Sequence, residues 1–215
     1  SLSHELRNPL SSVKMNLQIL KKSDINNPND QRRIDISIRE VGHLENILSQ
    51  LLDFAKPVRV KSEKLDIQTV ISSSLELLEH KFQEKKITPS FQLEKDNVQI
   101  VGDREKLEQV FINLFLNAIE ASSEGDRVII RSSMNSDGEQ PTVQLHIMDN
   151  GPGVPVDFMQ EVFKPFFTTK SKGTGLGLSI VQRILEAHGG SIQALNLKPR
   201  GTAFVVSLPL RRTYG

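Results

Sequence analysis

The sequence contains no cysteine, which excludes a disulfide framework and any metal site built from thiolates. It has no signal peptide and no apolar run near the roughly 20 residues that a membrane-spanning helix needs. The formal net charge is only +1 and the basic residues are scattered. The sequence therefore shows no cluster of positive charge that would bind nucleic acid or an anionic membrane. We therefore expect a soluble, cytoplasmic chain that binds neither nucleic acid nor a membrane.

The chain has 215 residues, of which 37% are apolar, enough for a small domain and a larger one. It opens on Ser-Leu-Ser-His, without an initiator methionine and already within a helical pattern. We therefore expect a fragment of a longer protein, with any membrane anchor lying upstream.

The first part of the chain shows two coiled-coil stripes separated by a turn-forming segment. The first stripe ends near Lys22, SDINNPND at 23–30 favours a hairpin loop, and the second stripe runs from Gln31 to Lys56, before Pro57. The stripes comprise Leu6, Leu10, Val13, Leu17 and Leu20, then Ile34, Val41, Leu48 and Ala55, with Leu44 and Leu51 on the alternate seam. Two such helices cannot close a core alone, whereas two copies make a four-helix bundle, so we predict a domain over 1–58 that forms a homodimer through residues 1–56.

Residues 59–215 mix strands and helices without a regular β–α–β repeat. The patterns predict a strand entry and an amphipathic helix over 65–86, strands over 87–94 and 98–103, a buried helix over 104–123, hairpin strands over 127–134 and 142–149, a helix over 178–188 capped by Gly189 and Gly190, and strands over 191–197 and 202–210. We therefore predict an α+β fold, in which the helical hairpin is followed by an α/β sandwich with a mixed sheet under a helical layer.

The segment SHELRNPL, residues 3–10, places a histidine on the exposed side of the first helix. His4 lies two residues before the seam position of Leu6. Glu5 can accept a hydrogen bond from one ring nitrogen and leave the other free as a nucleophile, while Pro9 would bend the helix just beyond. Most exposed histidines have no function, so this one gains meaning only from the motifs that follow.

Two further motifs carry groups suited to a nucleotide and its cation. NLFLNAIEA places Asn113 and Asn117 four apart on one helical face, where an amide oxygen can bind Mg²⁺, although such pairs are usually plain surface residues. DNGPGV, residues 149–154, follows a strand, and its Asp149 carboxylate can accept a hydrogen bond from an exocyclic amine, although a DNG turn is also common in plain hairpins.

A third motif, GTGLGLSI, places three glycines immediately before a helix. Gly173, Gly175 and Gly177 expose amide hydrogens at a helix amino end, where anions bind readily. A lone pattern of this kind is weak evidence, but the three motifs in this order reinforce one another.

Over nearly all its length the chain resembles the dimerisation and catalytic core of bacterial two-component sensor histidine kinases. SHELRNPL resembles the phosphoacceptor box of that family, NLFLNAIEA its N box, DNGPGV its first glycine box, FKPFF its F box and GTGLGLSI its second glycine box. The five boxes occur in the family's order. FFTTK shortly before GTGLGL, with the closing HGG and GTAFVVSLP, most resembles the subgroup that includes nitrogen-regulation sensors.

The resemblance implies roles for three residues near the amino end. His4 would attack the γ-phosphate of ATP, and Glu5 would orient it and take up its proton. The phosphoryl group would then pass to an aspartate in the receiver domain of a response regulator. Asn8 matches the position that orients water for dephosphorylation of that regulator, with a solvated surface amide as the alternative.

The resemblance also implies a site for ATP and Mg²⁺ in the second domain. Asn117 would hold Mg²⁺, with Asn113 supporting the phosphates or the metal. Asp149 would bind the adenine amino group, helped by Thr202. The lid and the base-packing positions would be Gly151, Gly153, Phe163, Phe166, Gly173, Thr174, Gly175, Leu176 and Gly177. Plain core packing is the alternative for the two phenylalanines.

One position departs from the family pattern. Many relatives carry Lys or Arg three residues after the metal-binding asparagine, whereas this chain has Glu120. A carboxylate cannot neutralise phosphate charge, so we hypothesise that Lys170 or Lys172 supplies the positive charge from the lid.

Two other functions remain open at this point. ATP hydrolases of similar fold, as in chaperones and topoisomerases, carry a glutamate where this chain has Asn113, and an amide is a poor base for activating water. The other alternative is a degenerate kinase kept as a dimeric docking platform, although every box here retains its chemical residues.

Overall fold

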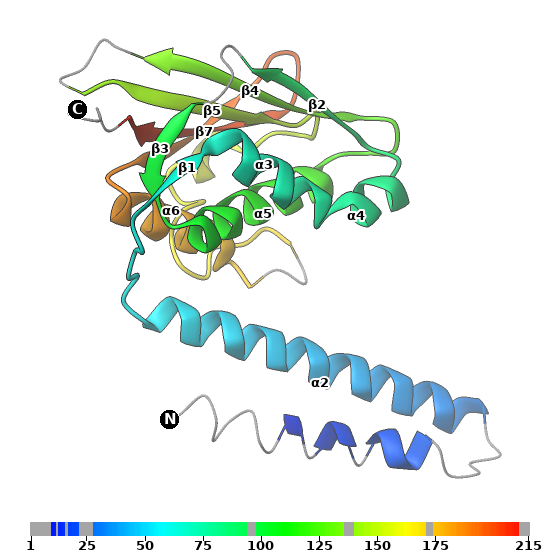
Figure 1. The fold of residues 1–215 in the computed structure, drawn as a ribbon. Helices are drawn as coiled ribbons and strands as arrows, with labels where there is room; N and C mark the ends of the chain where they lie inside the picture. Colours follow the sequence, from blue (N-terminus) through cyan, green and yellow to red (C-terminus); the bar gives the residue numbers. More distant parts are fainter. Residues whose placement is uncertain are drawn as a thin grey trace. The chain divides into compact units, whose positions relative to one another are not determined.

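The computed structural model of the chain describes residues 10–11, 13–15, 17–21, 28–93, 98–135, 140–170 and 174–210. The chain divides into two compact units, Ser1–Pro57 and Val58–Gly215 (Figure 1). None of the helices in these described ranges is long and apolar enough to cross a membrane.

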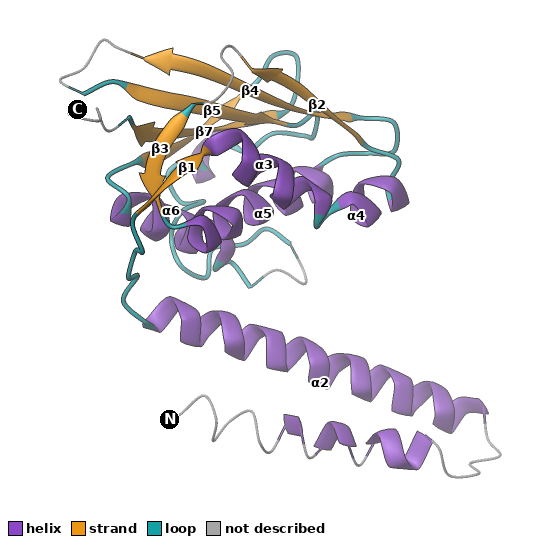
Figure 2. Cartoon of the chain, viewed as in Figure 1, coloured by secondary structure: helices purple, strands orange, loops and turns teal. Residues whose placement is uncertain are grey.

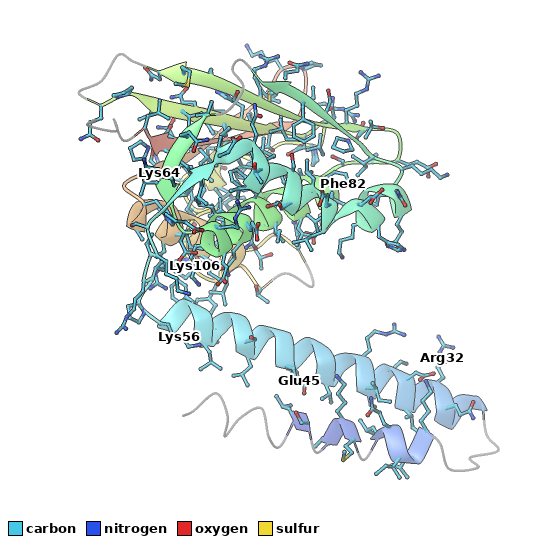
Figure 3. The ribbon with its side chains drawn as sticks, viewed as in Figure 1. Arg32, Glu45, Lys56, Lys64, Phe82 and Lys106 are labelled. Carbon is cyan, nitrogen blue, oxygen red and sulfur yellow. The ribbon has the colours of Figure 1, made fainter. Side chains whose placement is uncertain are left out.

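The first unit contains the long helix α2, Pro28–Ala55, and a preceding helical stretch within residues 10–21. Lys14 pairs with Glu45 at 3.3 Å and Lys21 pairs with Asp35 at 2.5 Å, so the two helices run antiparallel as a hairpin. Figure 3 shows Glu45 on the side of α2 that faces the first helix.

The expected boundary between loop and second helix was wrong by three residues. The predicted loop over 23–30 includes Pro28–Asp30, which form the first turn of α2. Proline suits the first helical position because its missing N–H would have no partner there and its φ is already helical. The helix ends at Ala55, one residue before the expected end and two residues before Pro57.

The second unit is built on a mixed sheet, as predicted, and this sheet has five strands (Figure 2). Its order is β2-β4-β5-β7-β6, with β2 parallel to β4 and the other neighbours antiparallel. The strands are β2 Thr88–Leu93, β4 Arg127–Asn135, β5 Thr142–Met148, β6 Ser191–Asn196 and β7 Thr202–Pro209. A separate antiparallel pair joins β1, Glu63–Asp66, to β3, Gln99–Gly102.

Helices cover one face of this sheet and enclose the core with it (Figure 2). They are α3 Ile67–Glu76, α4 Glu79–Glu84, α5 Arg104–Ala121 and α6 Gly177–Ala187. Helix α5 packs between α3 and α6 and against β4 and β5. Fully buried side chains include Phe111, Phe115, Ile130, Leu145, Ile147 and Leu185.

The single amphipathic helix expected within 65–86 was also wrong, because α3 ends before α4 begins. The Leu78 N–H donates to the Leu75 C=O, a tighter bond than the α-helical one, and the Ile87 N–H later donates to the Phe82 C=O. This break leaves Leu77 exposed and buries both Leu78 and Phe82. Leu78 and Phe82 lie four residues apart, so the buried face of α3 continues across the break into α4.

Candidate functional site

Helix α5 carries the two asparagines of the predicted nucleotide site. Asp103 caps this helix, since its Oδ1 accepts a hydrogen bond from the Lys106 N–H at 3.1 Å. Asn113 and Asn117 lie on the half-buried side of the helix, beside a buried stripe that fixes its rotation. The Asn113 Nδ2 donates to the Gln109 C=O at 2.9 Å, and a Cβ added at Gly177 would lie 2.9 Å from the Asn113 Oδ1. The N box and the start of α6 therefore meet at Asn113.

Asn117 faces a lysine from a distant part of the chain. The Lys170 Nζ lies 3.1 Å from the Asn117 Oδ1 and also forms an ion pair with the Glu120 carboxylate. Both side chains of the ion pair are about half exposed, at 44% and 53%. Lys170, which precedes the second glycine box, thus places a positive charge beside Glu120, the residue that departs from the family pattern.

Asp149 lies at the end of β5 and is only 3% exposed. Its Oδ1 accepts hydrogen bonds from the Gly151 N–H at 2.8 Å and the Thr202 N–H at 3.2 Å. Burial raises the pKa of this carboxyl above its ordinary value, with a further contribution from Asp126, although the two N–H donors and Lys170 act in the opposite direction. The predicted base-binding carboxyl is therefore fixed in direction and strongly desolvated.

The second glycine box requires glycine at position 175 for two reasons. Its φ is +67°, in the left-handed region that favours glycine. A Cβ there would lie 2.4 Å from the Phe166 carbonyl carbon, so this box packs directly against the backbone of the F box. Leu176 is fully buried and anchors the segment in the core, while Thr174 is half-buried and its Oγ1 accepts from the Leu176 N–H at 3.4 Å.

The phenylalanines of the F box have different surroundings. Phe163 is half-buried, whereas Phe166 is 60% exposed and has a φ of +66°. The ring of Phe167 packs against Phe158, with centroids 5.3 Å apart. Plain core packing is therefore wrong for Phe166.

Several predicted site residues lie outside the described residues. These are His4, Glu5, Asn8, Lys172 and Gly173. The structure brings together Asn113 with Gly177, Asn117 with Lys170, and Asp149 with Gly151 and Thr202.

The donor set on α5 fits a magnesium ion that is also bound by phosphates. Among the described residues, no group of three or more His, Cys, Asp or Glu side chains is arranged to hold a metal ion. Mg²⁺ bound with a nucleotide takes few protein ligands and completes its shell with phosphate oxygens and water. The Asn117 Oδ1 already contacts a cationic group, the Lys170 ammonium, so this oxygen is oriented as an acceptor of positive charge.

Asn196, Asp103 and His188 lie outside the predicted motifs but join distant segments of the second unit. The Asn196 carboxamide binds the backbone of Val154, 42 residues away. The Asp103 Oδ2 accepts a hydrogen bond from the Lys61 N–H at 2.9 Å, and the Asp103 N–H donates to the His188 Nε2 at 3.0 Å. These contacts join distant segments, and no local pattern in the sequence indicates them.

Comparison with known proteins connects both units to described families. Residues 102–212 match the family described as histidine kinase-, DNA gyrase B-, and HSP90-like ATPase. Residues 1–58 match the His kinase A (phospho-acceptor) domain.

Curated relatives extend this similarity along the whole chain. The sensor histidine kinase ZraS of Klebsiella oxytoca is 33% identical over 212 residues, which cover 97% of this chain and 45% of that protein. Sporulation kinase A of Bacillus subtilis is 37% identical over 209 residues, covering 97% of this chain and 33% of that protein. The chain thus spans less than half the length of these relatives.

Solved structures of histidine kinases are also similar to this chain. Full-length ShkA in complex with AMPPNP has a TM-score of 0.81 at 26% identity, over 97% of this chain and 44% of that one. The histidine kinase ThkA in complex with the response regulator protein TrrA has a TM-score of 0.73 at 28% identity, over 100% and 61%. The nucleotide-free catalytic domain of ThkA is 33% identical, with a TM-score of 0.63 over 70% and 96%.

Proposed function

This chain belongs to the histidine kinase family, and from that premise we propose that it is the core of a sensor histidine kinase. It would use Mg-ATP to phosphorylate His4 and then pass the phosphoryl group to an aspartate of a response regulator. One observation supports this proposal most directly: the second unit contains Asn113, Asn117, Asp149 and the glycine-rich segment, and a phospho-acceptor domain precedes it in the sequence. We assign the phospho-acceptor domain to 1–58, the ATP-binding domain to 59–215, and the activity to the cytoplasm, where ATP is available.

The ATP-binding domain would hold the nucleotide at both of its ends. The buried Asp149 carboxylate would accept a hydrogen bond from the adenine amino group, with Thr202 fixing its direction. Asn117 would bind Mg²⁺ and Asn113 would support the phosphates. The metal would neutralise charge on the β- and γ-phosphates, which together with positioning provides most of the catalysis in phosphoryl transfer.

The transfer itself would occur between the nucleotide and an imidazole nitrogen of His4. This nitrogen forms a bond to the γ-phosphorus while the bond from that phosphorus to the bridging oxygen of ADP breaks, and ADP leaves. Glu5 would take up the proton that the imidazole loses and would hold the ring in the reactive tautomer.

Lys170 would supply the positive charge that relatives place three residues after the metal-binding asparagine. Its ammonium group lies between the Asn117 amide and the Glu120 carboxylate, which supports this assignment. Lys172 remains the second candidate. Replacing both lysines by alanine should weaken ATP binding or phosphoryl transfer far more than a surface mutation, and unchanged kinetics would contradict this role.

The helical hairpin would dimerise through its exposed apolar stripe. Ile34 and Val41 are buried within one chain, whereas Leu44 and Leu51, seven residues apart, are 50% and 41% exposed. Val13 and Leu20 on the first helix are also seven apart and each 49% exposed. A second copy would cover both stripes and complete a four-helix bundle through residues 1–56.

The partner after autophosphorylation would be the receiver domain of a response regulator, and ThkA provides a precedent in its complex with TrrA. Asn8 would orient the water that removes the phosphoryl group from that regulator. The assignment to the nitrogen-regulation subgroup remains a proposal based on the closing motifs of the sequence.

Incubation with γ-labelled ATP and magnesium tests the proposed function against the two alternatives. The kinase predicts a protein-bound label that is stable in alkali, labile in acid and absent from His4→Gln. Release of free phosphate without labelling of the protein would support an ATP hydrolase. A chain without any turnover would fit a docking platform and would overturn the proposal.

A further inference from the structure

The segment DNGPGV, residues 149–154, is held at both ends by one turn of the chain. This turn joins β6 to β7 and runs from Asn196 to Thr202, which face each other as partners in the antiparallel ladder. At the first end of the segment, the Thr202 N–H donates to the Asp149 Oδ1 at 3.2 Å and the Asp149 N–H donates to the Thr202 C=O at 2.9 Å. Asn196 holds the other end.

Asn196 makes two hydrogen bonds with the backbone of a single residue. Its Oδ1 accepts from the Val154 N–H at 2.8 Å, and its Nδ2 donates to the Val154 C=O at 2.7 Å. A carboxamide offers a donor and an acceptor side by side, whereas a carboxylate offers acceptors only. The contact therefore requires an amide at position 196.

Gly153 makes this contact possible. A Cβ at position 153 would lie 2.9 Å from the Asn196 Oδ1, and the φ of Gly153 is +84°, in the left-handed region. Gly153 thus leaves room for the Asn196 side chain and also allows the left-handed backbone conformation of the loop.

We propose that Asn196 is a positioning residue of the nucleotide site. Together with Thr202 it fixes the shape of residues 149–154 before the nucleotide arrives, so that Asp149 and the backbone after it form a ready surface for the adenine base. The inference rests on the proposed function, which assigns this segment to base binding. A segment that is already ordered loses little conformational entropy when a ligand binds, and the gain appears as affinity.

The test compares three variants of the full chain: Asn196→Ala, Asn196→Asp, and Gln193→Ala as the matched control. Gln193 is an exposed residue on the same strand, three positions earlier. The measurements are the Kd of Mg-ATP by titration calorimetry, kcat and KM of autophosphorylation, and the midpoint of thermal unfolding.

We expect Asn196→Ala to raise Kd and KM by roughly tenfold, the scale of one to two lost hydrogen bonds, with kcat and the thermal midpoint as in Gln193→Ala. Asn196→Asp should be no better than the alanine variant, because its carboxylate would face the Val154 C=O. An unchanged Kd in Asn196→Ala, or a loss confined to kcat, would overturn the proposal. So would a lowered thermal midpoint with Kd restored on cooling, since that would indicate a general structural role.

Hydrogen exchange of the unmodified chain provides a second test that needs no variant to fold. The Val154 amide should exchange far more slowly than an amide in an unstructured peptide, and exchange at the unstructured rate would also contradict the proposal. Failure of the proposed function looks different, because the unmodified chain itself would then fail to bind Mg-ATP.

Discussion

The Lys170 ammonium contacts both the Asn117 amide oxygen, at 3.1 Å, and the Glu120 carboxylate. The negative charge of Glu120 is therefore paired with a lysine that lies 50 residues further along the chain. Because both members of the ion pair are about half exposed, the pair itself stabilises the fold by only about 0 to 1 kcal/mol. The ammonium group can thus turn from Glu120 to a phosphate at little cost.

Lys170→Ala should raise the KM for ATP by roughly 10- to 100-fold, the range of a hydrogen bond to a charged group, without lowering the thermal midpoint. Lys64→Ala, at an exposed lysine on β1, is the control and should leave both quantities unchanged. The exchange of charges in Lys170→Glu combined with Glu120→Lys should recover part of the loss, because a lysine at 120 again lies beside Asn117. Full activity in Lys170→Ala would assign the role to Lys172.

Asp149→Asn separates nucleotide binding from stability. Burial raises the pKa of Asp149 above its ordinary value of 3.8, so between that value and the raised pKa the folded chain binds more protons than the unfolded one. The free energy of unfolding therefore falls as pH rises from 3.8 through the raised pKa, because the buried carboxylate is less favourable than the buried neutral acid. The neutral asparagine removes this penalty, so the variant should be at least as stable as the unmodified chain at pH 7.

The same substitution should nearly abolish ATP binding. In the variant, the asparagine side chain keeps an oxygen for the N–H groups of Gly151 and Thr202, and its second polar atom becomes a donor that cannot accept from the adenine amine. Calorimetric titration with Mg-ATP and thermal melts at several pH values measure both effects. Asp157→Asn, at an exposed aspartate, is the control, and tight binding by Asp149→Asn would contradict the assigned role.

Local sequence patterns predicted the elements of the second unit because each buries one regular face. Alternating residues at 127–134 and 142–149 place the hairpin strands β4 and β5 within one residue of their observed ends. The break between α3 and α4 was missed because the buried residues Leu75, Leu78 and Phe82 keep helical spacing across it.

The sequence suggests candidate site residues where the groups lie within one motif, as for Asp149 after its strand, and it does not indicate contacts that join distant segments. The contact of Asn117 with Lys170 spans 53 residues, and that of Asp103 with His188 spans 85. Such pairs depend on the order of strands in the sheet and on the packing of α5 against α6, which a one-dimensional pattern does not contain.

Asp103 should make stability sensitive to acid. Burial acts to raise its pKa, but hydrogen bonds from the Lys61 and Lys106 N–H groups, together with the nearby positive charge of Lys106, lower it below the ordinary value of 3.8. A lowered folded-state pKa stabilises the fold above 3.8, and this contribution is lost as pH falls through the lowered pKa. Thermal midpoints measured from pH 7 into this acid range should therefore fall less steeply for Asp103→Asn than for the unmodified chain. Parallel curves would contradict this.

The bond from the Lys61 N–H to the Asp103 Oδ2, at 2.9 Å, ties the segment after Pro57 to the amino end of α5. Lys61→Pro removes this donor, while Lys61→Ala removes the exposed side chain and keeps the N–H. Because a nearly buried carboxylate would lose a partner, Lys61→Pro should lower the free energy of unfolding by about 1 to 3 kcal/mol, and Lys61→Ala by no more than about 0.5 kcal/mol. Urea titration of both variants gives the comparison.

Asp103→Ser provides a second background for the same comparison. A serine can still cap α5 through the Lys106 N–H but has only one side-chain oxygen for the two donors. In that background Lys61→Pro should cost little more, and an equal loss with and without Asp103 would show that the proline acts through backbone strain instead.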